Sequence, residues 1–426
     1  MRKAGFLKGF CMTGKGFEAM TSHTLPNTMR NTTGTVLYYC CQWLTTVFVV
    51  RLAGYDVSGT FSLVISYANI FGFISLYNLR NYQLSDVTRR FQPAQYTAAY
   101  AGTSAVALAL FLAILPFCGF NGYTLLCCLA YMLFKYCETA MHYLFTYFQL
   151  QGRYGRILLS FTLKSILPLA GFAAVLWLGY GLLAAILLMV LLFLVTILCY
   201  DLPKLKSAGI TGFSMRGIVT ILRESFPLML STLVLPYMLF FMRYAVESLY
   251  GREALGFFSA VTMVTVIMTT LASSVWFVIM PTLSGRYVNR QYTALRKQIL
   301  FILTAVLLTT AALLPLGQWL GGWAFSLVFG SEILPHMVLL PMTILSSGVL
   351  TAAIFLSIVL IAFRKRVRML LCMLLGAALL TALAFPLTAA YGSIGALYTF
   401  TAAVFLQLIP MLILILHACR KGTLNA

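Results

Sequence analysis

The chain alternates long apolar runs with short polar connections. Most runs reach about 20 residues, the length at which an α-helix crosses the hydrocarbon core of a bilayer. They lack the ten-residue alternation of polar and apolar positions that marks the strands of an outer-membrane barrel. The pattern therefore predicts twelve transmembrane helices, at residues 31–52, 58–84, 96–117, 122–150, 156–177, 180–200, 226–248, 255–282, 298–317, 334–362, 368–390 and 393–417.

The polar connections divide the chain into two halves. The longest of them, residues 201–225, separates a predicted N-lobe at 31–200 from a predicted C-lobe at 226–417. A basic tail at 1–30 precedes the first lobe, and a short tail at 418–426 follows the second. Lysine and arginine concentrate in alternate connections and in both tails, so the positive-inside rule predicts that both termini are cytoplasmic.

An eleven-residue pattern occurs once in each half. Residues 52–62 and 249–259 both read L-x-G-x-[D/E]-x-x-G-x-F-S, and the string Q-Y-T-A follows at 95–98 and 291–294. The copies are 197 and then 196 residues apart, which is typical of two fused repeats. We therefore predict an all-α polytopic membrane protein with twelve transmembrane helices in two parallel-repeat six-helix lobes around a central cavity.

The glycines of this pattern predict turns and close contacts. Gly54, Gly59, Gly251 and Gly256 permit a tight outward turn and close packing of helices. Substrate binding is therefore expected in the cleft that the repeats enclose, not at the repeated pattern itself.

Composition supports a membrane protein. Hydrophobic residues make up 61% of the chain and charged residues 9%, a balance that does not suit a soluble surface. The net charge of +20 matters through its distribution between connections, and no nucleic-acid partner is expected. The ten cysteines lie mostly within apolar runs and form no Cys-x-x-Cys motif, so we interpret them as small apolar residues.

No catalytic motif is found in the sequence. A nucleotide-binding loop, a dinucleotide fingerprint and a His-Glu-x-x-His helix are all missing from it, and its four histidines are scattered. A membrane-embedded glycosyltransferase or ligase is an alternative, but such enzymes usually carry a large extracytoplasmic loop. We predict a protein that is not an enzyme and uses neither a metal nor another cofactor.

Four basic residues within predicted spans are candidates for substrate binding. A charge near the bilayer centre costs about 2.5–3.5 kcal/mol on insertion scales, so it usually faces a cavity, a partner or an interface. Lys135, Lys164 and Arg243 lie deep, and we expect them to line a water-filled cationic cavity. Arg80, with the polar Asn81 beside it, lies about one turn from the end of its span, where an ordinary helix end is the alternative.

The span at 122–150 carries a polar and aromatic stripe. Tyr131, Lys135, Glu138 and His142 follow one another at spacings of four, three and four residues, which places them on one helical face. Such a face could line a cavity with a cation, a titratable carboxylate and a ring for stacking on a sugar. The alternative is a Lys135–Glu138 pair that neutralises itself between packed helices.

Three carboxylates are candidates for coupling transport to an ion: Glu138, Asp86 and Glu247. Glu247 lies four residues after Arg243, and an interfacial ion pair between the two is the favoured interpretation of Glu247. Only Glu138 lies convincingly deep within a span.

Three short motifs resemble those of a known family. They are the doubled turn, especially residues 251–259, the string Arg80-Asn81-Tyr82-Gln83 with Ser85-Asp86, and the string Pro281-Thr282-Leu283-Ser284. Their order and spacing resemble polysaccharide-export flippases of the Wzx type, in the multidrug/oligosaccharidyl-lipid/polysaccharide (MOP) transporter superfamily. Lipid II flippases of that superfamily usually have two further helices, which the twelve predicted spans do not include.

The resemblance implies a bacterial cytoplasmic (inner) membrane protein that translocates an undecaprenyl-diphosphate-linked oligosaccharide by alternating access. Its expected partners are this lipid-linked substrate, membrane lipids and other glycan-assembly membrane proteins. The role of cationic cavity residue is carried over to Arg80, Lys135, Lys164 and Arg243, and it agrees with the strong binding of phosphate by arginine and lysine.

Two other functions stay open at this point. An ion-coupled drug or metabolite antiporter of the same superfamily would need deep acidic residues for organic cations, and the deep charges here are mainly basic. A non-transporting scaffold for glycan assembly would tolerate every mutation in the cavity.

Overall fold

The computed structural model describes residues 14–85, 90–203, 214–363 and 365–424, and every regular element in these ranges is a helix. The N-lobe contains α1 (Gly14–Leu76), α2 (Leu79–Ser85), α3 (Pro93–Ile114), η1 (Leu115–Cys118), α4 (Gly122–Leu150), α5 (Tyr154–Trp177), α6 (Gly181–Thr196) and η2 (Ile197–Asp201). The C-lobe contains α8 (Ile218–Val288), α9 (Tyr292–Phe329), η3 (Ser331–Val338), α10 (Leu339–Ala362), α11 (Arg366–Tyr391) and α12 (Ser393–Leu424).

The prediction of twelve spans in two six-helix lobes is confirmed. Nine helices in the described ranges are long and apolar enough to cross a membrane, and two of them, Thr32–Leu84 and Ile218–Ser273, are 53 and 56 residues long. Each of these two is long enough for two crossings and bends at a glycine. The remaining span is α4, whose 29 residues are long enough for one crossing although this helix carries the polar stripe.

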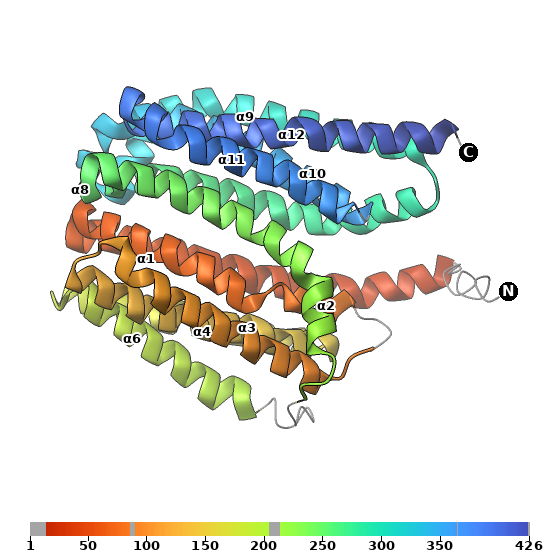
Figure 1. The fold of residues 1–426 in the computed structure, drawn as a ribbon, viewed down its shortest axis with the longest axis horizontal. Helices are drawn as coiled ribbons and strands as arrows, with labels where there is room; N and C mark the ends of the chain where they lie inside the picture. The colour runs from red at the N-terminus through yellow and green to blue at the C-terminus, as the bar shows by residue number, and fades with distance from the viewer. Residues whose placement is uncertain (1–13, 86–89, 204–213, 364, 425–426) are drawn as a thin grey trace.

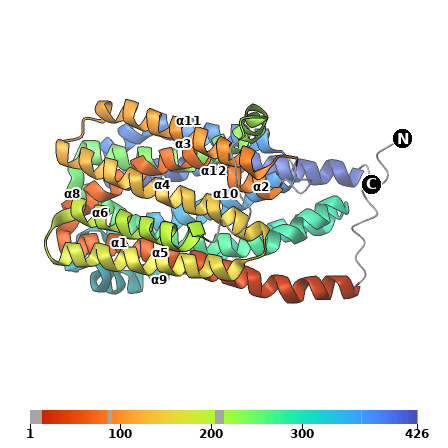
Figure 2. The same ribbon diagram turned by 90° about the horizontal axis from the view of Figure 1, so that it is seen from below.

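The chain reverses direction at Gly54 in α1 and at Gly251 in α8 (Figure 1). Their φ and ψ angles are 87° and 176°, and 82° and −178°, in a region that glycine adopts without steric cost. The predicted turns are therefore confirmed at equivalent positions of the repeat. We call this end of the molecule the hinge end. The opposite end, toward which the first turns of α1 and the last turns of α12 extend, is called the termini end (Figures 1 and 2).

The lobes meet where the second glycine of each repeat contacts the other repeat. A Cβ atom added to Gly59 would lie 1.8 Å from the carbonyl oxygen of Arg252, and one added to Gly256 would lie 2.0 Å from that of Tyr55. These two contacts are equivalent, because Gly59 and Gly256, like Tyr55 and Arg252, are 197 residues apart. The predicted close packing is thus a reciprocal backbone contact between α1 and α8.

Two apolar cores extend from this contact. One fills the N-lobe between α1, α4, α5 and α6, and includes Phe61, Phe134 and Phe172. The other joins Val50 and Leu63 of α1 to α8, α10 and α12 of the C-lobe. Part of α1 therefore belongs to the core of the opposite lobe.

The predicted span at 58–84 is broken near its end. Tyr77 and Asn78 have φ angles of 48° and 56°, and this left-handed step separates α1 from α2. Asparagine tolerates this conformation better than most residues. The break matters because it sets the position of Arg80 in the first turn of α2.

Candidate functional site

The polar face of α4 contains the predicted stripe and packs against α1. Lys135 and Glu138 form an ion pair, and Tyr38 of α1 donates a hydrogen bond to Oε1 of Glu138 at 2.7 Å. Gln42 in turn donates to the Tyr38 hydroxyl at 3.0 Å. Both carboxylate oxygens of Glu138 therefore have partners within the N-lobe, as the self-neutralising alternative predicted, and its role in ion coupling stays a prediction.

The stem of Lys135 crosses α1 at a glycine. A Cβ atom added to Gly72 would lie 2.7 Å from both Cγ and Cε of Lys135. Any larger residue at position 72 would displace the lysine, so Gly72 leaves the space in which the ammonium reaches Glu138.

Arg80 reaches the same face of α4 from the termini end. Its Nη1 lies 3.4 Å from Nδ1 of His142, and its Nη2 donates to Oε1 of Gln149 at 3.3 Å. Neither partner is a carboxylate. The structure thus brings four of the predicted residues to one surface of α4: Arg80, Lys135, Glu138 and His142.

Lys164 lies in the interior of the N-lobe and forms an ion pair with Asp201; neither side chain is exposed. Its ammonium also lies 5.2 Å and 5.5 Å from the ring centroids of Phe145 and Phe193. We expected Lys164 to line a water-filled cationic cavity, and Asp201 was assigned to the polar linker. It instead ends the π-helical turn Ile197–Asp201, which continues α6 into the lobe. A contact between Lys164 and a substrate stays a prediction.

Arg243 lies between the lobes. Its Nη1 donates to Oγ of Ser66 in α1 at 2.6 Å, and its buried Nε has no hydrogen-bond partner among the described residues. The favoured ion pair with Glu247 is wrong for this structure, since the part of the chain that it describes has no such contact. Eight residues before Gly251, Arg243 lies about 12 Å along the helix from the hinge.

The other predicted residues lie apart from these contacts. Tyr131 is buried, with 3% of its surface exposed, and its ring packs edge-on against Phe61 at 5.7 Å. Asn81 is exposed and donates to Oδ1 of Asn78 at 2.6 Å. Asp86 lies outside the described residues.

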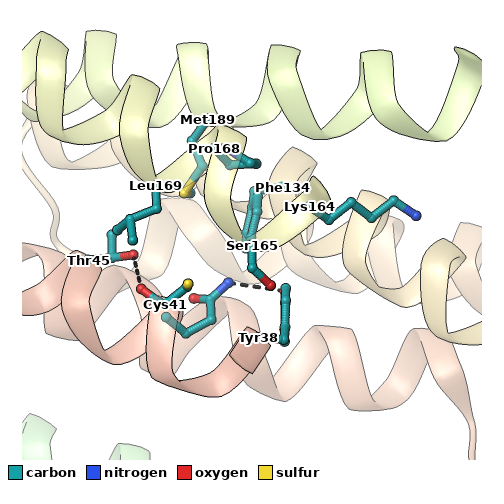
Figure 3. Close-up of a pocket in the computed structure, with 10 residues that line it drawn as sticks. Tyr38, Cys41, Thr45, Phe134, Lys164, Ser165, Pro168, Leu169 and Met189 are labelled. Atoms are coloured by element: carbon teal, nitrogen blue, oxygen red, sulfur yellow. Dashed lines mark hydrogen bonds between the residues drawn. The ribbon is translucent and has the colours of Figure 1, made fainter. Parts of the chain in front are cut away.

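A small cavity in the N-lobe separates α1 from α5 (Figure 3). Its volume of about 10 Å³ holds at most about one water molecule. The Lys164 side chain lines the cavity, but its ammonium end points away from the other labelled side chains (Figure 3). The cavity is lined by Tyr38, Cys41, Gln42, Thr45, Phe134, Lys164, Ser165, Pro168, Leu169 and Met189. It is too small for a lipid headgroup or a sugar.

The inner charges do not cancel. Glu138 and Asp201 each hold one lysine. Arg80 and Arg243 are left without a carboxylate partner within the described ranges. The arrangement therefore has excess positive charge in the N-lobe and at the lobe interface, which suits an anionic ligand.

Sequence reasoning missed four partners of these charges: Tyr38, Ser66, Gln149 and Asp201. Each of these partners lies on a different helix from the charged residue that it contacts. The spacing of Tyr38 and Gln42, four residues apart on one helix, was a local indication of a polar face on the first span.

The fold matches that of solved transporters. The Vibrio cholerae MATE transporter VcmN in its bent form has a TM-score of 0.62 at 15% identity, over 96% of this chain and 98% of that chain. A multidrug resistance MATE family transporter of the MOP superfamily in its inward-facing conformation has a TM-score of 0.63 at 15% identity, over 91% and 94%. A MOP superfamily transporter from Pyrococcus furiosus, described as having a binding pocket of reverse polarity that suggests a different function, has a TM-score of 0.57 at 14% identity, over 94% and 95%.

No protein-family profile and no curated protein matches the chain by sequence. The chain therefore shares the two-lobe fold of MOP superfamily transporters over nearly its whole length. At 14–15% sequence identity, this similarity establishes the fold and not the substrate.

Proposed function

We propose that the protein translocates an undecaprenyl-diphosphate-linked oligosaccharide across the membrane by alternating access of its two lobes. The observation that carries this proposal is the excess of inner cations. Arg80 and Arg243 have no carboxylate partner among the described residues, whereas both buried carboxylates, Glu138 and Asp201, are held by lysines.

The chemistry of the two arginines supports a diphosphate ligand. A guanidinium group can donate two parallel hydrogen bonds to phosphate oxygens, and these bonds are strong in a poorly solvated site. The contacts of Arg80 and Arg243 in this structure are to neutral groups, which a diphosphate can replace without separating an ion pair.

The two arginines also lie at different depths. Arg80 follows the end of α1 at the termini end, and Arg243 lies within α8 about 12 Å from the hinge. We propose that the diphosphate meets Arg80 first and Arg243 later, while the sugars pass through an aqueous space that opens between the lobes and the polyprenyl tail stays in lipid.

An antiporter for organic cations is less well supported by the charges. A cation requires an accessible carboxylate, yet both oxygens of Glu138 are already hydrogen-bonded. Efflux of ethidium by membrane vesicles containing the protein tests this alternative, and we expect no efflux above vesicles without it.

The main test measures surface glycan in a strain that lacks the protein and expresses one variant at a time. Arg243→Ala is expected to reduce glycan export at least about ten-fold, and Arg80→Ala by a smaller factor, because each loses a charge-assisted phosphate contact. Arg243→Lys should keep part of the activity. Arg296→Ala, which removes an exposed arginine near the start of α9, is the matched control and should export normally. Normal export by both Arg80→Ala and Arg243→Ala, at wild-type protein levels, would contradict the proposal.

A further inference from the structure

A second basic site lies at the termini end of the C-lobe. A cavity of about 480 Å³ separates the beginning of α8 from the turn between α10 and α11. One wall consists of Glu224, Pro227 and Leu228, and the other of Lys365, Arg366, Val367 and Arg368. This volume lies in the range of pockets that hold small ligands or lipid headgroups.

The charge of this cavity is positive. Three of its seven residues are basic, and the single carboxylate, Glu224, is already neutralised by Arg90 at 2.9 Å. Arg366 and Arg368 are exposed and have no acidic partner among the described residues. Their charges are therefore available to an anion that enters the cavity.

Exposed apolar side chains flank the cavity on both of its walls. Val367 lines it and is 60% exposed, and Phe226, next to Pro227 in α8, is 48% exposed. Leu371, one turn after Val367 in α11, is also exposed. Exposed apolar side chains at the end of membrane-spanning helices face lipid, so the ligand of this cavity can have an acyl or prenyl chain.

We propose that this basic cavity binds the phosphate-bearing headgroup of a lipid. Basic pockets between transmembrane helices on the cytoplasmic side have this chemistry. Two sources share it: an anionic phospholipid of the bilayer, and the polyprenyl diphosphate of the proposed substrate as it approaches the protein. The first source is independent of the proposed function, and only the second rests on it.

The positive-inside rule alone would place basic residues at this end of every lobe. The cavity distinguishes Arg366 and Arg368 from such residues. Arg296 and Lys297, in the second turn of α9, are likewise exposed and near a helix start, but they do not line the cavity. They therefore provide a control with matched charge and matched secondary structure.

The test is native mass spectrometry of the purified full-length protein in detergent. The protein is titrated with dioleoyl phosphatidylglycerol, with undecaprenyl diphosphate and, as a zwitterionic reference, with dioleoyl phosphatidylcholine. We compare wild type with the double variants R366Q/R368Q, R366K/R368K and R296Q/K297Q. Thermal melting of each variant verifies that it is folded.

For R366Q/R368Q we expect the first anionic lipid to bind about ten-fold more weakly, since each basic residue near the surface contributes measurably to phosphate binding. R366K/R368K and R296Q/K297Q should stay within about two-fold of wild type. Loss with phosphatidylglycerol alone identifies a bilayer lipid, loss with undecaprenyl diphosphate alone identifies the substrate, and loss with both identifies a general phosphate site. Equal weakening in R296Q/K297Q, or wild-type binding of phosphatidylcholine as tight as that of both anionic lipids, would overturn the proposal.

Because this measurement follows lipid binding in detergent, it does not depend on glycan export. Unchanged lipid binding by R366Q/R368Q would overturn the headgroup site and would have no bearing on the export test of Arg80 and Arg243. Normal export by the Arg80 and Arg243 variants would equally leave the headgroup site standing.

Discussion

The polar interior of the N-lobe and the hinge-end contact between the lobes are built from different interactions. In the N-lobe interior, Lys135–Glu138 and Lys164–Asp201 are ion pairs within one lobe. At the hinge end, the lobes meet through the glycine contacts at Gly59 and Gly256 and through stacked rings.

The hinge-end contact uses backbone groups and aromatic surfaces. The Tyr55 ring stacks on Phe257 with centroids 3.8 Å apart, and Phe257 stacks on His336 at 3.9 Å. Arg51 crosses between the lobes, but its Nε donates to the carbonyl oxygen of Val328 at 2.7 Å, at the end of α9, and not to a carboxylate. Interactions of this kind can form and separate without leaving a charge unpaired.

This difference bears on how two lobes can move. Separating a buried ion pair leaves an uncompensated charge and costs several kcal/mol, so pairs confined to one lobe move with it as a rigid unit. Contacts between lobes that are small, neutral and closely packed are of the kind that a rigid-body transition can separate as a unit. The interlobe hydrogen bond of Arg243 likewise has a neutral acceptor, the hydroxyl of Ser66.

The largest effect is expected from the buried ion pair. Asp201→Asn leaves the Lys164 ammonium without its partner in a fully buried position, and should destabilise the protein by about 3–5 kcal/mol. The double variant Lys164→Met/Asp201→Leu removes both charges and should recover most of this loss. Thermal melting in detergent measures both. If the double variant were as unstable as the single one, the ion pair would have to stabilise the lobe by more than cancelling its two charges.

A smaller effect is expected at the hinge end. Gly59→Ala places a Cβ atom against the Arg252 carbonyl, and the overpacking should cost about 1–3 kcal/mol and separate the lobes there. Gly102→Ala is the control, because a Cβ atom at this helical position in α3 meets nothing within 4 Å. The melting temperature and the labelling of a cysteine introduced at Ser62, which is buried in wild type, measure the two consequences. Unchanged labelling and melting in Gly59→Ala would refute the contact.

The smallest effect is expected at the termini end. Arg90 and Glu224 form an ion pair between exposed side chains, and such pairs contribute at most about 1 kcal/mol because water and salt screen them. Arg90→Gln should therefore shift the melting temperature little, and the remaining difference should vanish in high salt. A large, salt-independent loss would mean that this contact, and not the hinge end, holds the lobes together.

Much of the fold was predictable from patterns that repeat along the chain. The apolar runs predicted the membrane spans, and the doubled pattern at 52–62 and 249–259 predicted the two lobes and their glycine turns. Both follow from local or periodic constraints: the length of a membrane crossing, and the positive φ angles that Gly54 and Gly251 supply.

The partners of the inner charges were not predictable in the same way. The spacing of Lys135 and Glu138 indicated their pairing, because both lie on one helix. Asp201 was read as part of a linker, since only the π-helical turn at the end of α6 carries it into the core beside Lys164. The break at Tyr77, which directs Arg80 toward α4, likewise has no periodic pattern.

The sequence by itself determined that this is an all-helical membrane protein of two repeated lobes with an excess of basic charge. The tertiary structure decided which of those charges are neutralised, which face the lobe interface, and which line the cavity at the termini end. The physical reason is that the length and periodicity of a span depend on its own residues, whereas the charge state of a site depends on neighbours from other helices. Arg243 shows this directly: its sequence neighbour Glu247 does not pair with it, and Ser66 of the opposite lobe does.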